Sequence, residues 1–319
     1  MKMSKLSQIW DFFINQSRSN DNEGEYFYTK LIDEKLQHLF YAGLGENKSI
    51  LIALETNVQP PLIEEKIDSI KTFRHQRHDG KWFLVIQLVN YELRDVFEKL
   101  CDDLIAATID IRSNEVALSM TVKRLKLWIS LLNKTNKGFL QDFQIRGLIA
   151  ELNFIKKVVA SNIFSLTQAI NSWVGPNNAP QDFIFSKEAY EIKSIAVGKR
   201  KISISSLEQL EFNGDLKIVV FELLNCSKND LNKVNLNIIT SEIETLINDS
   251  DLLIIFKTKL LEIGYFQHNF YNDKNFQIVE GYKFRVDDNF PKLLRSNIPR
   301  EIVNASYEIN VEKITKEIF

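Results

Sequence analysis

Apolar residues recur at helical spacing in several parts of this chain of 319 residues. Spacings of three and four residues place them on one face, which predicts amphipathic helices. The predicted helices cover residues 91–108, 115–132, 143–160, 241–248 and 251–263. Alternating or continuous apolar runs predict strands at 49–55, 82–89, 163–174, 182–186, 189–193, 199–205, 216–224, 283–286 and 307–311. Because helices and strands intermix along the chain, the pattern predicts an α/β fold.

The order of these elements predicts closely packed parts rather than domains on a linker, because no repeat, low-complexity tract or clean linker interrupts the chain. Residues 1–112 are predicted to form an N-terminal α/β accessory domain. Residues 113–264 are predicted to form the core that carries the chemistry, with residues 265–319 as a C-terminal extension packed on it. A chain of this length can bury one large core or two smaller ones.

The segment 180–193 reads as two short strands joined by a turn at 187–188, with charges where strands normally bury apolar residues. Residues two apart share a face of a strand. This predicts Asp182, Glu191 and Lys193 on one face. The other face would carry Phe183, Phe185, Tyr190 and Ile192. Two carboxylates and an ammonium in one patch are suited to holding a hard divalent cation and activating a water; a solvated charged hairpin is the alternative.

Glu151 is the second unusual position, because it lies in the apolar face of the predicted helix 143–160. Its neighbours on the helical wheel are Gly147, Leu148, Phe154, Ile155 and Val158. A carboxylate there is costly unless a cation or hydrogen bonds satisfy it. Glu151 is therefore a candidate metal ligand; the alternative is an ion pair with an Arg or Lys of the core.

Composition limits the remaining functions. The net charge of −2 gives no general attraction to nucleic acid, so phosphate contacts are expected from the local basic run Lys199, Arg200 and Lys201. Cys101 and Cys226 lack the paired spacing of a zinc knuckle or disulfide framework and suit a reducing cytoplasm. We expect a cytoplasmic protein, because neither an apolar signal core nor a membrane-length apolar run is found. The sequence shows no aromatic stripe interleaved with basic residues, so most of the 22 Phe and 9 Tyr are assigned to the core.

These residues resemble the PD-(D/E)xK nuclease superfamily, the fold of many restriction endonucleases. The resemblance rests on Glu151 in the preceding helix, Pro180-Gln-Asp182 opening one strand and Glu191-Ile-Lys193 on the next. Gln181 is a departure, because Pro and Asp are adjacent in the superfamily name. More narrowly, the chain resembles an uncharacterised bacterial family of this superfamily, and residues 115–225 carry the match. The matching segments are Arg146-Gly-Leu-Ile-Ala-Glu151, Trp173-Val-Gly-Pro and Ile202-Ser-Ile-Ser-Ser-Leu-Glu-Gln-Leu210.

The resemblance implies an αβββαβ core with a mixed central sheet and a Mg²⁺-dependent endonuclease that hydrolyses DNA phosphodiester bonds in restriction or phage defence. Mn²⁺ is a second candidate cofactor. The implied metal ligands are Asp182, Glu191, the carbonyl of Ile192 and Glu151, with Lys193 and Gln209 completing the catalytic residues. DNA is the expected partner, with RNA left open, and no membrane is expected. Homodimers and defence-system partner proteins follow only by analogy. The alternative is a non-catalytic nucleic-acid-binding or scaffold subunit of a defence complex.

Overall fold

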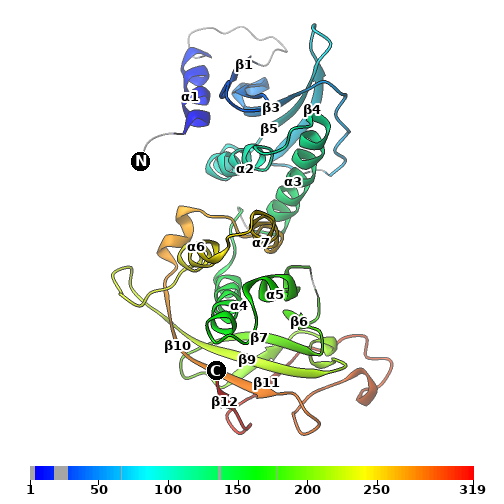
Figure 1. Ribbon diagram of the computed structural model, residues 1–319, viewed down its shortest axis with the longest axis vertical. Helices are drawn as coiled ribbons and strands as arrows, with labels where there is room; N and C mark the ends of the chain where they lie inside the picture. Colours follow the sequence, from blue (N-terminus) through cyan, green and yellow to red (C-terminus); the bar gives the residue numbers. More distant parts are fainter. Residues whose placement is uncertain (1–3, 18–27, 66, 136–137, 178) are drawn as a thin grey trace. The chain divides into compact units, whose positions relative to one another are not determined.

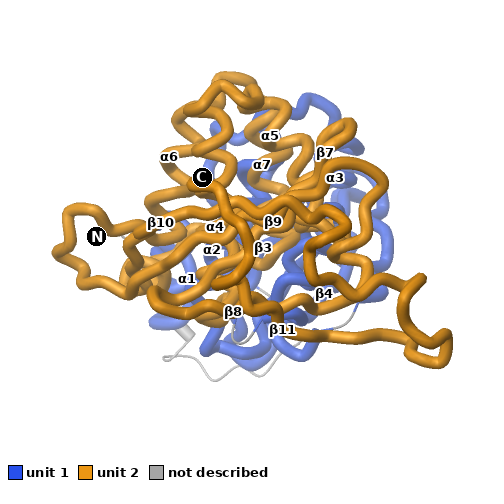
Figure 2. The backbone as a smooth tube through the Cα atoms, turned by 90° about the horizontal axis from the view of Figure 1, so that it is seen from below, with its two compact units in different colours: residues 1–138 blue, residues 139–319 orange. Residues whose placement is uncertain are grey.

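The computed structural model describes residues 4–17, 28–65, 67–135, 138–177 and 179–319. They form two compact units, unit 1 (1–138) and unit 2 (139–319), shown in Figures 1 and 2. The sequence placed this boundary at 112/113. It falls later because the helix α3 (Asn114–Lys134) packs on the helix α2 (Arg94–Ala106) and on strand β3 (Ile50–Thr56), and so belongs to unit 1.

Unit 1 is built on an antiparallel sheet with the strand order β1-β2-β3-β5-β4. Its further elements are α1 (Lys5–Ser17), β1 (Tyr28–Leu31), β2 (Phe40–Leu44), β4 (Ile70–Gln76) and β5 (Trp82–Leu88). Strand β3 is buried along its whole length, as its continuous apolar sequence requires. The structure therefore confirms the strands predicted at 49–55 and 82–89 and the helical region that follows them.

Unit 2 contains a mixed sheet with the order β12-β10-β9-β7-β6, in which β7 and β9 run parallel and the other neighbours are antiparallel. The helices are α4 (Asp142–Ala160), α5 (Leu166–Ser172), α6 (Leu236–Leu246) and α7 (Ser250–Ile263). The strands are β6 (Phe183–Phe185), β7 (Glu188–Ala196), β8 (Lys201–Ile204), β9 (Asp215–Asn225), β10 (Phe276–Arg285), β11 (Tyr307–Asn310) and β12 (Glu317–Ile318). The central place of β9 confirms the prediction for 216–224.

The sheet of unit 2 has a core on each face. On one side α4 packs on β7 and β9, and Phe154 of the helix lies against Phe183 and Tyr190. On the other side Ala189 and Ile218 share a second core with residues of β8 and β11, which pair into a small separate sheet. Residues that alternate along β7 therefore enter different cores, which fixes the face of each charged residue on that strand.

The segment 163–174 corrects a prediction, because it forms helix α5 and not the first core strand. A capping box between Ser165 and Gln168 starts the helix, and an isolated bridge from Trp173 to Phe183 follows it. The αβββαβ order is kept in a reduced form. Its first strand is that single bridge, and its second helix is the 3-10 turn η4 (Leu207–Leu210) between β7 and β9.

The C-terminal region is more closely integrated than an extension packed on the core. Strand β10 pairs along β9 from Phe276 to Arg285, and β12 pairs with β10 in turn. Residues 265–319 thus supply strands of the main sheet and, through β11, part of the second core. Among the described residues, none of the helices has both the length and the apolar content needed to span a bilayer.

Candidate active site

The hairpin β6–β7 places the predicted charged residues. Phe185 pairs with Glu188, so the loop is 186–187 and the register is shifted from the predicted turn at 187–188. Moving the loop by one residue shifts each pairing partner by two positions, so every side chain stays on the strand face predicted for it. A shift of the partners by one position would have exchanged the two faces. Continued by one residue, this register puts Asp182 opposite Glu191. Asp182 Oδ2 accepts a hydrogen bond of 2.7 Å from the Ile192 amide.

Glu191 is held by two other predicted site residues, Lys193 of the same strand face and Gln209 of the turn η4. Lys193 Nζ lies 2.7 Å from Glu191 Oε1, and Gln209 Nε2 donates to the same oxygen at 3.0 Å. Lys193 also donates to Gln209 Oε1 at 3.4 Å. Glu191 is 2 % exposed, and within the described part of the chain its Oε2 is buried without a hydrogen-bond partner. Such an oxygen is costly in a folded protein and is free to accept a further ligand.

Glu151 approaches Asp182 from the helix α4. The indole N–H of Trp173 donates to Glu151 Oε2 at 2.7 Å, so the recorded partner of this carboxylate is an indole and not the Arg or Lys of the alternative interpretation. A Cβ built on Gly175 would lie 3.0 Å from Asp182 Oδ1 and 3.5 Å from Glu151 Oε2. The two carboxylate oxygens therefore border one small space, which the glycine keeps open.

The pKa values of the three carboxyl groups show how they interact. Burial, together with the charge of Asp182, raises the pKa of Glu191 to about 8. Burial likewise raises the pKa of Asp182 to about 6, although the Ile192 amide and Lys193 oppose the shift. The pKa of Glu151 lies well above its usual range because of burial and the charges of Asp182 and Glu191. Groups perturbed by burial and by each other mark a candidate functional site.

The residues of this cluster fit a divalent cation in their chemistry. Carboxylate and carbonyl oxygens are the ligands that Mg²⁺ prefers. The partnerless oxygen of Glu191 and the space at Gly175 are suited to a positive charge. Within the described ranges, no three His, Cys, Asp or Glu side chains already stand together as a metal site. In this conformation the ammonium of Lys193 neutralises Glu191 instead.

The basic run after β7 lies on the surface and is partly engaged within the chain. Arg200 Nη1 lies 3.3 Å from Glu222 Oε1, and Lys201 Nζ lies 3.0 Å from Glu308 Oε2. These two cations would have to exchange a carboxylate for a phosphate, which lowers their net value for binding DNA.

Gln181 is a site residue that the sequence reasoning missed. It is 3 % exposed, and its Nε2 donates to the carbonyls of Glu208, Gln209 and Glu211 at 2.8, 3.3 and 3.2 Å. The residue that interrupts the Pro–Asp motif therefore ties the Asp182 segment to the turn that carries Gln209. Its position directly before Asp182 was the available signal.

The comparisons with known proteins agree with this geometry. Neither the search of curated proteins nor that of solved structures gave a match. A family model described as "Putative PD-(D/E)XK family member, (DUF4420)" matches residues 6–312 and so spans both units. The residue types in that superfamily name are those of Asp182, Glu191 and Lys193. The chain therefore belongs to this PD-(D/E)XK family.

Proposed function

We propose that unit 2 is a divalent-metal-dependent endonuclease that hydrolyses DNA phosphodiester bonds, in restriction or phage defence. The observation that carries the proposal is the convergence of Asp182, Glu191 and Lys193 on one face of β6–β7, with Gln209 bound to two of them. Membership of the PD-(D/E)XK family indicates a nuclease-like function. That the substrate is DNA and that the protein acts in restriction or phage defence are further parts of this proposal.

Each residue has a role that its position supports. Asp182, Glu191 and the carbonyl of Ile192 would hold Mg²⁺ or Mn²⁺, with Glu151 beside them. The cation would supply positive charge for the phosphate and polarise the attacking water. Lys193 would orient that water and neutralise the charge that develops on the phosphate. Gln209 fixes Glu191.

The cluster must lose protons before it binds a cation, because a metal ligand has to be deprotonated. Glu191, with a pKa of about 8, is largely protonated at neutral pH in the absence of a cation. Lys193 and Gln209 both contact its Oε1. At neutral pH Glu191 thus keeps its proton until a cation replaces it, whereas Asp182, with a pKa of about 6, is already largely ionised.

A cleavage panel tests the function. The full-length protein is incubated with plasmid, with linear duplex, with single-stranded DNA and with RNA, each in Mg²⁺, Mn²⁺ or EDTA. We expect metal-dependent cleavage of DNA that EDTA abolishes. Cleavage that continues in EDTA would contradict the metal dependence. Cleavage of RNA alone would show that the substrate is RNA and not DNA.

Two lysines of similar surroundings give a matched pair of variants. Lys193 and Lys217 have side chains 16 % and 15 % exposed, and each pairs with a glutamate, at 2.7 and 2.6 Å. Lys193→Ala should lower the cleavage rate about 100-fold or more, as expected for removing a group that stabilises the transition state, with DNA binding retained. Lys217→Ala should cleave as the parent does. A folded, DNA-binding parent without cleavage under any metal would instead support the non-catalytic subunit.

A further inference from the structure

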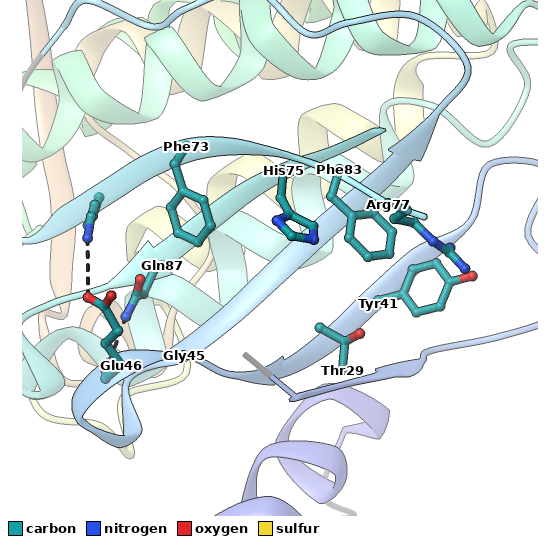
Figure 3. A pocket seen from close by; sticks show the side chains of 10 residues that line it. Thr29, Tyr41, Gly45, Glu46, Phe73, His75, Arg77, Phe83 and Gln87 are labelled. Carbon is teal, nitrogen blue, oxygen red and sulfur yellow. Dashed lines mark hydrogen bonds and ion pairs between the residues drawn. The ribbon is translucent and has the colours of Figure 1, made fainter. Parts of the chain in front are cut away.

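The sheet of unit 1 carries a cavity of about 650 Å³ on one face, within the size range of small-molecule sites. Strand pairing builds it, because Tyr41, Ala53, Val85 and Phe73 stand in line across β2, β3, β5 and β4. Ala53 and Val85 are fully buried between the rows of Tyr41 and Phe73. Figure 3 shows the rings of Tyr41, Phe73, His75 and Phe83 around the cavity.

Cations already lie over these rings. The Arg77 guanidinium is 5.1 Å from the ring centre of Phe83 and 6.0 Å from that of Tyr41. Lys71 Nζ is 5.7 Å from the ring centre of Phe73. Arg77 is held in place by an ion pair with Glu55. The cavity therefore presents aromatic faces beside positive charge, the combination on which protein surfaces stack the bases of single-stranded nucleic acids.

A buried amide supplies polar recognition at one end. Gln87 is 4 % exposed, and its Nε2 donates to the Glu46 carbonyl at 3.3 Å. The residues that the structure describes donate no hydrogen bond to its side-chain oxygen. A Cβ on Gly45 would lie 3.0 Å from Gln87 Nε2, so a glycine there gives the amide room. A side-chain amide with a free acceptor oxygen, placed in an aromatic cavity, can form hydrogen bonds with the edge of a planar heterocycle.

We propose that this cavity binds one unpaired nucleotide of a nucleic acid strand. The base would stack on Tyr41 and Phe73, its edge would meet Gln87, and its phosphate would lie near Arg77 and Lys71. A purely apolar ligand would make no use of the amide or of the cations, and a bare anion would make no use of the rings. A base held in a duplex cannot enter such a cavity without leaving its stack. The site lies within unit 1 and does not depend on the cleavage chemistry of unit 2.

The sequence reasoning missed this surface. Lys71, Phe73, His75 and Arg77 alternate along and just after β4, but the other rings come from separate strands. Tyr41 lies on β2, Phe73 on β4 and Phe83 on β5. Only the pairing of β3 and β5 between them brings the rings together. Tyr41 and Phe73, which are only partly buried, are exceptions to the expectation that most aromatic residues are core.

Binding by the full-length protein tests the proposal. A short fluorescein-labelled single strand and its duplex are titrated by fluorescence anisotropy in EDTA, which prevents cleavage. We expect the single strand to bind more tightly. Tyr41→Ala and Phe73→Ala should each weaken it about five-fold or more, the value of one lost base–aromatic stack. Tyr91→Ala, which removes a 52 % exposed ring beside Arg94, is the matched control and should leave binding unchanged.

Further measurements separate the outcomes. Lys71→Gln changes an exposed side chain and should also weaken binding. A free nucleoside monophosphate should compete with the strand, and inorganic phosphate should not. Equal competition by phosphate, equal binding of duplex, or unchanged binding by the Tyr41, Phe73 and Lys71 variants would each overturn the proposal. Intact binding without cleavage in Mg²⁺ would refute the nuclease function alone.

Discussion

Removing the charge of Glu191 should change how the stability of unit 2 depends on pH. The pKa of this buried carboxyl is about 8, against an ordinary value of 4.5. The folded protein therefore binds the proton more tightly than the unfolded chain does. This contribution to the free energy of unfolding is fully present below about pH 4.5 and is lost as the pH rises to about 8. At about 1.4 kcal/mol per pH unit the loss is about 5 kcal/mol.

Glu191→Gln is the perturbation that isolates this effect, because glutamine imitates the protonated acid. Its side-chain oxygen can still accept from Lys193 and Gln209. We expect the variant to match the parent near pH 5 in EDTA and to be more stable near pH 8, with the difference approaching the full loss. At high pH the parent buries a charged carboxylate whose desolvation Lys193 offsets only in part, and the variant avoids this cost.

The assay must report unit 2 by itself. Urea unfolding at a series of pH values, read by a brief deuterium pulse and mass spectrometry of peptides from β7 and β9, meets this condition. Glu222→Gln is the control, since it removes a 5 % exposed carboxyl of the same sheet that pairs with Arg200; it should keep the slope of the parent. A parent whose stability is constant or rises between pH 5 and 8, or a Glu191→Gln variant with the parent's slope, would refute the reasoning.

Three further predictions concern the cation and DNA. Gly175→Ala places a methyl group 3.0 Å from Asp182 Oδ1 and should weaken the rise in melting temperature that Mg²⁺ produces. Gly147→Ala is the control, because its methyl group meets no atom within 4 Å. It should leave that rise intact and stabilise helix α4 by about 0.5–1 kcal/mol. Glu151→Gln should raise the melting temperature in EDTA and shrink the Mg²⁺ increment, because it removes one of the mutually repelling charges; strong destabilisation in EDTA would contradict this. Replacing residues 199–201 by Ala should flatten the plot of log affinity for duplex DNA against log salt by about 0.9 per lost phosphate contact; an unchanged slope would place the phosphate surface elsewhere.

The predictions that depended on local periodicity agree with the structure. Period-two alternation put Asp182, Glu191 and Lys193 on one strand face, and they remain there although the turn lies one residue earlier. The helical wheel put Glu151 among apolar neighbours, and Leu148 and Phe154 beside it are buried. Such patterns survive small errors of register because they depend on the spacing of neighbouring residues and not on the partner strand.

The predictions that failed depended on contacts distant in sequence or on a competing local signal. The segment 163–174 has the apolar content of a strand, but the Ser165 cap and Gln168 start a helix there. The membership of β10 in the main sheet follows from its pairing with β9, which nothing in its own sequence specifies. The role of Gln181 depends on carbonyls far along the chain at η4. Pairings of this kind are set by the whole fold.

The contacts that neutralise Glu191 in the absence of a cation also explain why the cluster can exist in a stable fold. Asp182 and Glu151, which border one space, and Glu191 nearby would repel one another if all were ionised. The pKa of about 8 keeps a proton on Glu191 near neutral pH, and Lys193 opposes the negative charge of Glu191 once that group ionises. A cation that displaces this proton replaces the attraction that Lys193 supplies to Glu191. In the proposed nuclease, metal binding would therefore release the Lys193 ammonium to act on the phosphate. The ion pair that stabilises the metal-free site would thus make Lys193 available only when the cation is bound.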